Sequence, residues 1–192
     1  MSTQSWLESI KEANRAFTDR VSADDLPTAR APGPAVITCM DPRVNLGALG
    51  IPGFAEDGSN DSAVRIIRTL GGMAEERSLI VGMFLANISE IVVLMHTDCG
   101  CCLAYKNIDT IISRMQKRLS EEAFGSFKGR IGEPFRENLL AHLKAFEDPF
   151  EAVIKEVVAI KALPYAPENL VVHGLVYGLE TGEAEVVVDG YA

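Results

Sequence analysis

The segment IVVLMHTDCGCC, residues 91–102, concentrates side chains that could do chemistry. His96 and three of the four cysteines of the chain, Cys99, Cys101 and Cys102, lie within seven positions there. Such a cluster could form a disulfide, a redox pair, a closed structural metal site or a catalytic metal site. Cysteine thiolate and imidazole are typical ligands of zinc, which binds four ligands in tetrahedral geometry. The function depends on which of these sites the chain builds.

The fourth cysteine, Cys39, ends a similar apolar run at residues 35–40. His96 and Cys99 are spaced as a ligand pair that a tight turn after a strand can direct at one ion. With Cys39 they make a Cys₂His set, the pattern of a catalytic zinc site that keeps its fourth position open. Each residue also has an ordinary explanation, because single buried cysteines are common in cores and an interior histidine is often only hydrogen-bonded.

Hydrophobic patterns predict the elements that must position these residues. Apolar, β-branched runs predict strands over 35–40, 63–72 and 90–98, and a strand–turn–strand hairpin over 169–188. Amphipathic or apolar runs of helical length predict helices over 4–20, 78–88, 105–124, 137–147 and 150–162. This alternation predicts an α/β fold with a mostly parallel central β-sheet flanked by helices and a C-terminal antiparallel edge hairpin.

The predicted sheet places the reactive segments at one edge. Both CMDPR (39–43) and HTDC (96–99) follow the carboxyl end of a predicted strand, where open α/β sheets bind their ligands. A chain of 192 residues is long enough for one well-buried domain and too short for two. We therefore expect a single domain over 1–192, in which residues 1–30 form an N-terminal helical arm and linker.

Composition restricts the partners and the location. The net charge is −9 and no block is rich in Lys or Arg, which argues against nucleic acid and anionic membrane surfaces as partners. No apolar stretch reaches the roughly 18 residues of a membrane span, and the N-terminus has no apolar core of signal-peptide type. A cytoplasmic location is expected. In that reducing compartment, metal binding, catalysis or core packing explains cysteines better than disulfides do.

Several motifs together resemble those of one enzyme family. CMDPR (39–43), RIIRTLGG (65–72) and HTDCG (96–100) resemble the C-x-D-x-R … H-x-x-C zinc signature of the β-class carbonic anhydrases. The C-terminal region, FEDPFEAV through GEAEVV (146–187), is similar to the helix, proline-containing loop and hairpin that end the family's fold. The resemblance runs from about residue 35 to about residue 188 and keeps the order of the motifs.

The resemblance implies zinc held by Cys39, His96 and Cys99, with Asp41 and Arg43 as a catalytic dyad. Zinc-bound hydroxide would attack CO₂ and give bicarbonate and a proton. Ionised Asp41 can only accept hydrogen bonds, so it would take the hydroxide proton and leave a lone pair facing the substrate.

Arg43 would hold Asp41 by a bidentate pair. Without that pair Asp41 could bind zinc as a fourth ligand, and the family is known in both forms. The alternative is that Asp41 and Arg43 form an ordinary ion pair in a surface turn, which contributes little to the stability of the fold.

Three further expectations come with the resemblance. Two thiolates make zinc a weaker Lewis acid than three neutral histidines do, so activity should rise toward alkaline pH. The N-terminal helix should pack across a partner copy, which implies a homodimer or homotetramer. The substrate is expected to be a small neutral molecule, CO₂ or a related heterocumulene.

Departures from the family pattern keep other functions open. Where the family often has RNAGG, this chain has RTLGG (68–72), which could make the pocket more apolar. Some proteins with the same zinc signature hydrolyse carbonyl sulfide or carbon disulfide, and an apolar pocket would suit those substrates. Cys101 and Cys102 could be apolar filler at the start of a helix, which we favour, or thiols whose pKa is lowered by the helix N-terminus. No proton shuttle is evident, and His142 and His173 are expected to be structural or solvated.

A non-catalytic alternative uses the same residues. Cys101 or Asp41 could fill the fourth position on zinc, leaving a closed site that serves stability or binding. The position of Arg43 argues against this alternative, since a purely structural site has no need of it. A thiol–disulfide enzyme is less favoured, because the cysteine spacing is C-x-C-C and not C-x-x-C.

Overall fold

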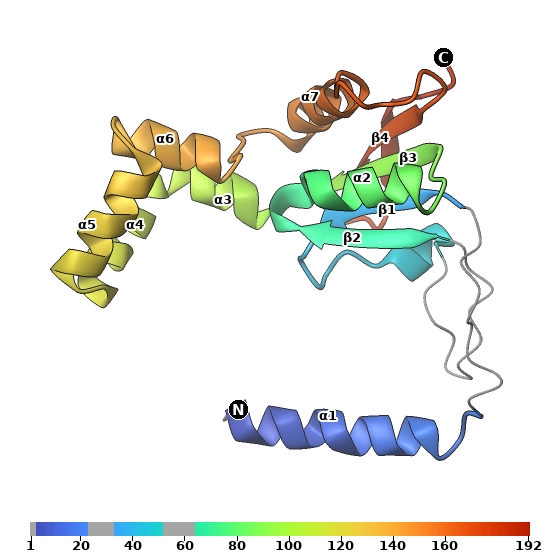
Figure 1. Cartoon of the computed structure of the whole chain (residues 1–192), viewed down its shortest axis with the longest axis horizontal. Helices are drawn as coiled ribbons and strands as arrows, with labels where there is room; N and C mark the ends of the chain where they lie inside the picture. The colour runs from blue at the N-terminus through green and yellow to red at the C-terminus, as the bar shows by residue number, and fades with distance from the viewer. Residues whose placement is uncertain (1–2, 23–32, 52–63) are drawn as a thin grey trace.

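The protein is built around one five-stranded sheet. The computed structural model describes residues 3–22, 33–51 and 64–192. The strand order is β2-β1-β3-β4-β5, with β1 to β4 parallel and β5 antiparallel to β4 (Figure 1). The strands are β1 (Ala35–Cys39), β2 (Arg65–Thr69), β3 (Glu90–His96), β4 (Val171–Tyr177) and β5 (Ala184–Val188). The predicted α/β fold with a C-terminal edge hairpin is confirmed.

The strand register brings two reactive residues to the same edge. All five residues of β1 are buried, as expected for a central strand of a parallel sheet that is covered on both faces. Thr38 pairs with Leu94 across β1 and β3, and its hydroxyl donates a hydrogen bond to the Leu94 carbonyl (2.9 Å). Cys39 therefore ends β1 close to the point where His96 ends β3.

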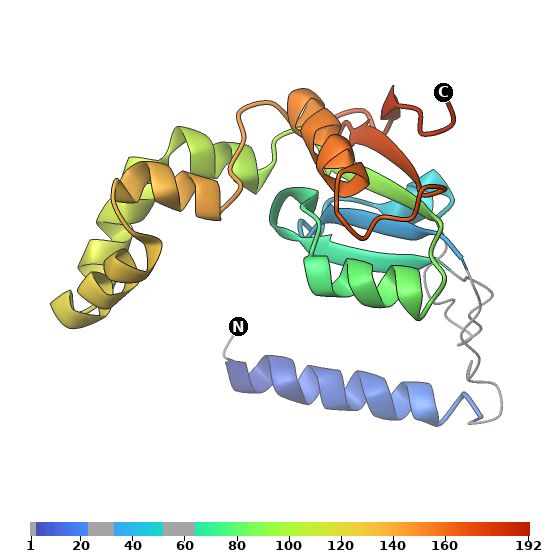
Figure 2. The ribbon, with the colours of Figure 1, turned by 45° about the horizontal axis from the view of Figure 1, so that its top comes forward.

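Two helices cover one face of the sheet. Leu79 and Met83 of α2 (Glu76–Phe84) share a core with the strand residues. Val153 and Val157 of α7 (Pro149–Lys161) join the same core, and both helices lie over the sheet in Figure 2. Full burial of each such side chain contributes about 1.5–3 kcal/mol to folding. The helices predicted over 78–88 and 150–162 correspond to α2 and α7.

The opposite face is covered differently. The short 3₁₀ helix η2 (Leu46–Leu49) and the preceding Val44 pack against Val36, Leu94 and Tyr177. Among the residues that the structure describes, this segment supplies the buried cover of that face, and no α-helix belongs to the same core cluster.

Four helices between β3 and α7 extend away from the sheet (Figure 1). They are α3 (Gly100–Lys106), α4 (Ile108–Arg118), α5 (Glu121–Ile131) and α6 (Phe135–His142). The prediction of a single helix over 105–124 is wrong, because the helical conformation is interrupted at Asn107 and again before Ser120. The Asn107 side chain donates to the Leu103 carbonyl (2.9 Å), and Ser120 caps α5 by accepting from the Ala123 N–H (3.2 Å). The α6 helix corresponds to the helix predicted over 137–147.

The N-terminal helix α1 (Thr3–Thr18) confirms the helix predicted over 4–20 and lies apart from the sheet in both views (Figures 1 and 2). Its apolar side chains are exposed, with fractions of 62% for Trp6, 50% for Leu7 and 44% for Ile10. Most of the predicted linker falls within residues 23–32, outside the described residues. No helix in the described part of the chain has both the length and the apolar character that crossing a membrane requires.

Candidate metal centre

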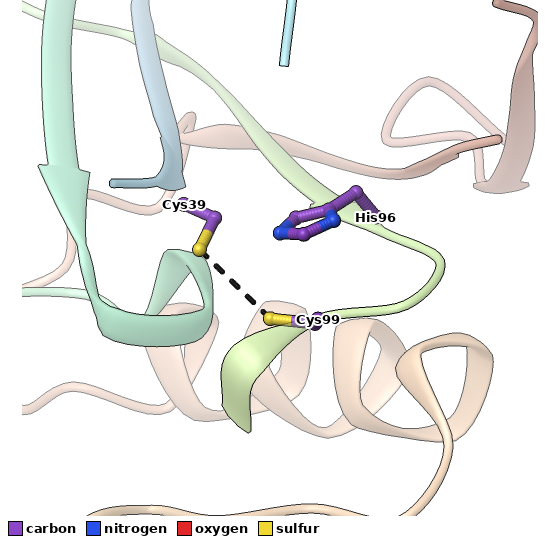
Figure 3. Close-up of side chains that lie close together, drawn as sticks. All are labelled: Cys39, His96 and Cys99. Atoms are coloured by element: carbon purple, nitrogen blue, oxygen red, sulfur yellow. Dashed lines mark hydrogen bonds between the residues drawn. The ribbon is translucent and has the colours of Figure 1, made fainter. Parts of the chain in front are cut away.

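Cys39, His96 and Cys99 meet at the carboxyl-end edge of the sheet (Figure 3). Cys39 ends β1, His96 ends β3, and Cys99 is the residue that caps α3. One possible ligand atom from each residue lies within 4.8 Å of the other two, and the two Sγ atoms are 3.8 Å apart. All three side chains are buried. Within the described residues, no other three His, Cys, Asp or Glu side chains come close enough to share an ion.

The ring of His96 is oriented for metal binding. Its Nδ1 lies 2.7 Å from the carbonyl oxygen of Thr97, which can only accept, so we assign the ring hydrogen to Nδ1. The Nε2 atom then carries a free lone pair, is fully buried, and has no hydrogen-bond partner among the described residues. Buried polar atoms are rarely left without a partner. Figure 3 shows the ring beside both sulfur atoms, so the imidazole and the two sulfur atoms could bind the same metal ion.

The two sulfur atoms share a hydrogen bond. This bond with Cys99 lowers the pKa of the Cys39 thiol, against the effect of burial, with help from His96 and from the backbone of Asp41 and Gly71. The same hydrogen bond raises the pKa of Cys99. Burial opposes protonation of His96, but its contacts with Cys39 and Thr97 outweigh this and raise its pKa. A preformed thiolate, a second thiol and a lone pair of imidazole suit zinc.

Asp41 is held beside this group by Arg43. The Arg43 Nε donates to Asp41 Oδ1 (3.0 Å), Nη2 donates to Oδ2 (2.8 Å), and the backbone N–H of Arg43 donates to Oδ1 (2.9 Å). These hydrogen bonds hold the pKa of Asp41 well below its usual range, so the carboxylate is ionised near neutral pH. Asp41 lies outside the group of three ligand atoms. The structure therefore has the arrangement in which Arg43 restrains Asp41, and not the one in which Asp41 is a fourth ligand.

Arg43 also binds a residue that the sequence did not single out. Its Nη1 donates to Asp98 Oδ2 (2.8 Å), and its Nη2 donates to the Asp98 carbonyl (3.1 Å). Asp98 has a positive φ of 49°, a conformation that Asp tolerates better than most residues. Arg43 thus links the loop after β1 to the loop after β3, next to Cys99.

Arg68 fixes the backbone around Asp41 from the neighbouring strand β2. Its Nη1 donates to the carbonyl oxygens of Cys39 (2.9 Å) and Asp41 (3.3 Å), and its Nη2 donates to the carbonyl of Val44 (3.2 Å). The sequence marked Arg68 only as the first residue of the RTLGG motif. Its position in that motif was the available signal that Arg68 belongs to the site. Its hydrogen bonds could not be predicted, because they depend on the pairing of β1 with β2.

The two glycines of the same motif allow the backbone to approach the centre closely. Gly71 and Gly72 end the 3₁₀ turn η3 (Leu70–Gly72) with φ values of 70° and 77°. A Cβ on Gly72 would lie 3.2 Å from the Leu94 carbonyl oxygen and 3.4 Å from the Cys39 nitrogen. A Cβ on Gly71 would lie 3.0 Å from the Cys101 sulfur. Both positions therefore require glycine.

Thr97 connects His96 to the C-terminal hairpin. Its N–H donates to the Tyr177 carbonyl (3.0 Å), and its hydroxyl donates to Glu180 Oε2 (2.8 Å) and accepts from the Leu179 N–H (2.9 Å). These three contacts fix the Thr97 carbonyl that orients His96. No local sequence signal indicates this role of Thr97, because Glu180 lies 83 residues away.

The remaining cysteines lie beside the centre but do not join it. Cys101 and Cys102 are buried in the first turn of α3 and pack with Leu70 and Phe146. Burial raises the pKa of Cys101 to about 11 and also raises that of Cys102. The Cys101 thiol lies 3.5 Å from the Lys144 carbonyl. This contradicts the alternative of thiols with a lowered pKa, and it places Cys101 outside the ligand group of a closed site.

The other histidines are not part of the centre. His142 ends α6 and is exposed. His173 pairs with Val92 near the opposite end of the sheet, and its Nδ1 accepts a hydrogen bond from the Gly190 N–H (3.1 Å). Neither residue belongs to the group at the carboxyl-end edge.

Comparisons with known proteins agree with this geometry. The crystal structure of β-carbonic anhydrase isoform I from Trichomonas vaginalis superposes with a TM-score of 0.74, at 26% identity, over 100% of both chains. A carbonic anhydrase structure from Streptococcus mutans gives a TM-score of 0.70 at 26% identity, over 95% of this chain and 98% of that one. The Bacillus subtilis (strain 168) protein named "Putative carbonic anhydrase YtiB" is 31% identical over 97% of this chain and 98% of its own.

The chain belongs to the β-carbonic anhydrase family. Members of this family use zinc, and the Cys₂His group offers the donor set for it. A protein named "Carbon disulfide hydrolase" from Acidithiobacillus thiooxidans is also similar to this chain, at 28% identity over 76% of this chain and 68% of the relative. No protein-family model matches the chain.

Proposed function

We propose that the protein catalyses the reversible hydration of CO₂ to bicarbonate and a proton, with zinc bound by Cys39, His96 and Cys99. One observation carries the proposal. Three buried ligand atoms converge without a fourth protein ligand among the described residues, and an ionised carboxylate is held close by. Bound zinc would act as a Lewis acid that makes water a nucleophile. Membership of the β-carbonic anhydrase family supports the same reaction.

The dyad has a definite role in this proposal. Because Asp41 is ionised, its oxygens can only accept, so the carboxylate would accept a hydrogen bond from the attacking water and orient its lone pair. Arg43 keeps the carboxylate from turning toward the ligands, since three donors of Arg43 hold it. Asp98 occupies the remaining side of the Arg43 guanidinium and so limits its movement.

The surroundings of the sulfur ligands suit a small neutral substrate. Leu70, Ala145 and Phe146 pack against the cluster formed by the four cysteines. An apolar wall excludes water and offers no charge to a neutral linear molecule such as CO₂.

Hydrolysis of carbonyl sulfide or carbon disulfide is a second candidate. It is favoured by Leu70, which lies against the cysteine cluster, and by similarity to proteins named carbon disulfide hydrolases. Stopped-flow measurement of CO₂ hydration, set against sulfide release from both sulfur compounds by the same zinc-loaded protein, separates the two. We expect CO₂ hydration to be the faster reaction. Sulfide release faster than hydration by orders of magnitude would reverse the assignment.

We also propose that the protein is a homodimer or homotetramer. The support is α1, whose Trp6, Leu7 and Ile10 are exposed in the single chain. Burial of these side chains would require the surface of another copy. Sedimentation velocity at micromolar concentration tests this proposal, and a clean monomer would contradict it.

Domain organisation and location complete the proposal. Residues 1–192 would form one zinc-dependent domain, with 1–30 as its N-terminal arm and linker, because the sheet draws its strands from positions 35 to 188. A cytoplasmic location fits the reduced cysteines and the acidic composition, with neither nucleic acid nor a membrane as partner. Fractionation of cells that express the tagged protein would test the location.

A further inference from the structure

Glu156 is a carboxylate in an apolar interior. The buried polar side chains of the described residues are Thr38, His96 and Glu156, and the first two belong to the strands that form the centre. Glu156 instead lies on α7, where Val153, Val157 and Ile160 form the core. Burial of a carboxylate is costly unless the group makes specific hydrogen bonds. The position of Glu156 therefore requires an explanation from its contacts.

Its contacts lead toward the metal centre. The Oε1 of Glu156 accepts a hydrogen bond of 2.7 Å from the backbone N–H of Ala74, a residue 82 positions away. The Nζ of Lys144 lies 3.5 Å from the same oxygen. Lys144 is half-exposed, so solvent screens its charge and the ion pair contributes little. The short bond to Ala74 is the main interaction of Glu156.

Ala74 ends the segment that packs against Cys39. The preceding residues 70–73 form a turn that consists of η3 and Met73. The turn is closed by a hydrogen bond of 2.6 Å from the Thr69 hydroxyl to the Met73 carbonyl. Within this turn Gly72 lies against the Cys39 backbone nitrogen. Figure 3 shows the turn that follows β2 lying beneath the Cys39 sulfur. A shift of Ala74 would move this turn relative to the thiolate.

We propose that Glu156 is a positioning residue for the metal centre: its hydrogen bond to Ala74 holds the 70–73 turn against Cys39 and thereby sets the environment of that sulfur ligand. The inference rests on the proposed function, since it takes Cys39 as a zinc ligand. Contacts that lie beyond the ligands orient them and tune the metal.

Cobalt(II), loaded into the full chain in place of zinc, provides the test, because its thiolate absorption bands report the sulfur ligands directly. Glu156→Leu removes the acceptor, while Glu156→Gln keeps an acceptor oxygen and removes the charge. We expect Glu156→Leu to weaken cobalt affinity by roughly 10- to 100-fold and to shift the thiolate bands. We expect the zinc-loaded Glu156→Leu variant to lose kcat with little change in KM. Glu156→Gln should match the wild type in all three measurements.

Two further variants guard against a loss of folding. Glu151→Leu changes an exposed carboxylate on the same helix and should leave the cobalt spectrum unchanged. Glu156→Asp keeps the charge but shortens the side chain by one methylene, so it should weaken cobalt binding if position matters. This variant tests the inference even if Glu156→Leu fails to fold.

Three outcomes would contradict the inference. If Glu156→Leu or Glu156→Asp lowers only the melting temperature and leaves the cobalt spectrum and affinity unchanged, Glu156 serves core stability alone. If Glu156→Gln weakens cobalt binding as much as the other two variants, the charge matters and the positioning bond does not. A wild-type protein that binds no cobalt or zinc would overturn the proposed function itself, and the inference with it.

Discussion

The polar side chains at the carboxyl-end edge of the sheet find hydrogen-bond partners within a single chain, whereas the apolar side chains of the N-terminal helix are exposed to solvent. At the edge, Asp41 and Asp98 are both bonded to Arg43, and the ring of His96 is fixed by Thr97. In α1, by contrast, the apolar side chains that a helix normally buries are exposed, Trp6 most of all.

This difference shows which parts of the protein are complete in a single chain. Parallel strands place their carboxyl ends together, so β1 and β3 assemble the candidate metal centre without help from another copy. An amphipathic helix gains its stability by burying its apolar face, and within the described part of the chain the apolar side chains of α1 stay exposed. Metal binding and self-association should therefore respond to different substitutions.

The largest effect is expected from loss of a ligand. His96→Ala removes the buried Nε2 atom, so zinc should be lost and CO₂ hydration should fall roughly 10³-fold or more, since the metal supplies several kcal/mol. Zinc content by atomic absorption and hydration by stopped flow measure both effects. His142→Ala, on the exposed end of α6, is the matched control. If the His96→Ala variant still contained one zinc per chain, His96 would not be a zinc ligand.

A smaller loss is expected from the dyad. Arg43→Gln breaks the pair with Asp41, so kcat should fall roughly 10²-fold while zinc remains bound. The control is Arg77→Gln, because Arg77 makes the same kind of pair with Glu75 two residues away but lies on α2. A kcat within twofold of the wild type in the Arg43 variant would mean that the dyad is only a surface turn pair.

The third effect falls on α1 alone. Trp6→Ala should weaken self-association by roughly 30-fold, or about 2 kcal/mol, the typical effect of losing an aromatic anchor. Zinc content should not change, because α1 contributes no ligand. Sedimentation velocity over a concentration series measures the change, and Lys11→Ala, in an exposed ion pair of the same helix, is the control. Loss of zinc together with association would mean that the two regions are not independent.

The smallest effect concerns stability in acid and arises at the start of α2. Hydrogen bonds from Arg77 and Ser78 lower the pKa of Glu75 from 4.5 to about 2. A carboxylate with a lowered pKa stabilises the folded state above its unfolded pKa, and this contribution is lost as the pH falls through the folded value. The wild type should therefore exceed Glu75→Gln in unfolding free energy by a constant amount above pH 4.5 or so. Urea unfolding should show that difference disappearing toward pH 2, and a difference independent of pH would contradict this origin.

Local sequence signals predicted much of the fold and the ligand types. Buried strands such as β1 read as continuous apolar runs, and thiolate and imidazole at strand ends indicate zinc. The Asp41–Arg43 dyad, by contrast, was expected only from the resemblance to the β-class carbonic anhydrases. The breaks at Asn107 and Ser120 were missed because an amphipathic pattern continues across both. Ser120 was the available signal, as a residue that favours helix N-termini.

Contacts between distant segments could not be predicted in the same way. Asp98 binds Arg43 across 55 positions, Arg68 binds the Cys39 carbonyl across 29, and Glu156 reaches Ala74 across 82. Each contact depends on the strand register and the packing of α7, which no local pattern specifies. The sequence therefore indicated which residues could bind the metal, whereas only the fold reveals what holds them in place.

X-ray absorption at the zinc edge of the wild-type protein would show the ligands of the metal directly. We expect one zinc per chain with two sulfur ligands at about 2.3 Å and one imidazole nitrogen at about 2.0–2.1 Å. The fourth ligand should be a light atom that exchanges with solvent. A protein without zinc, a shell of four permanent protein ligands, or a sulfur count other than two would contradict it.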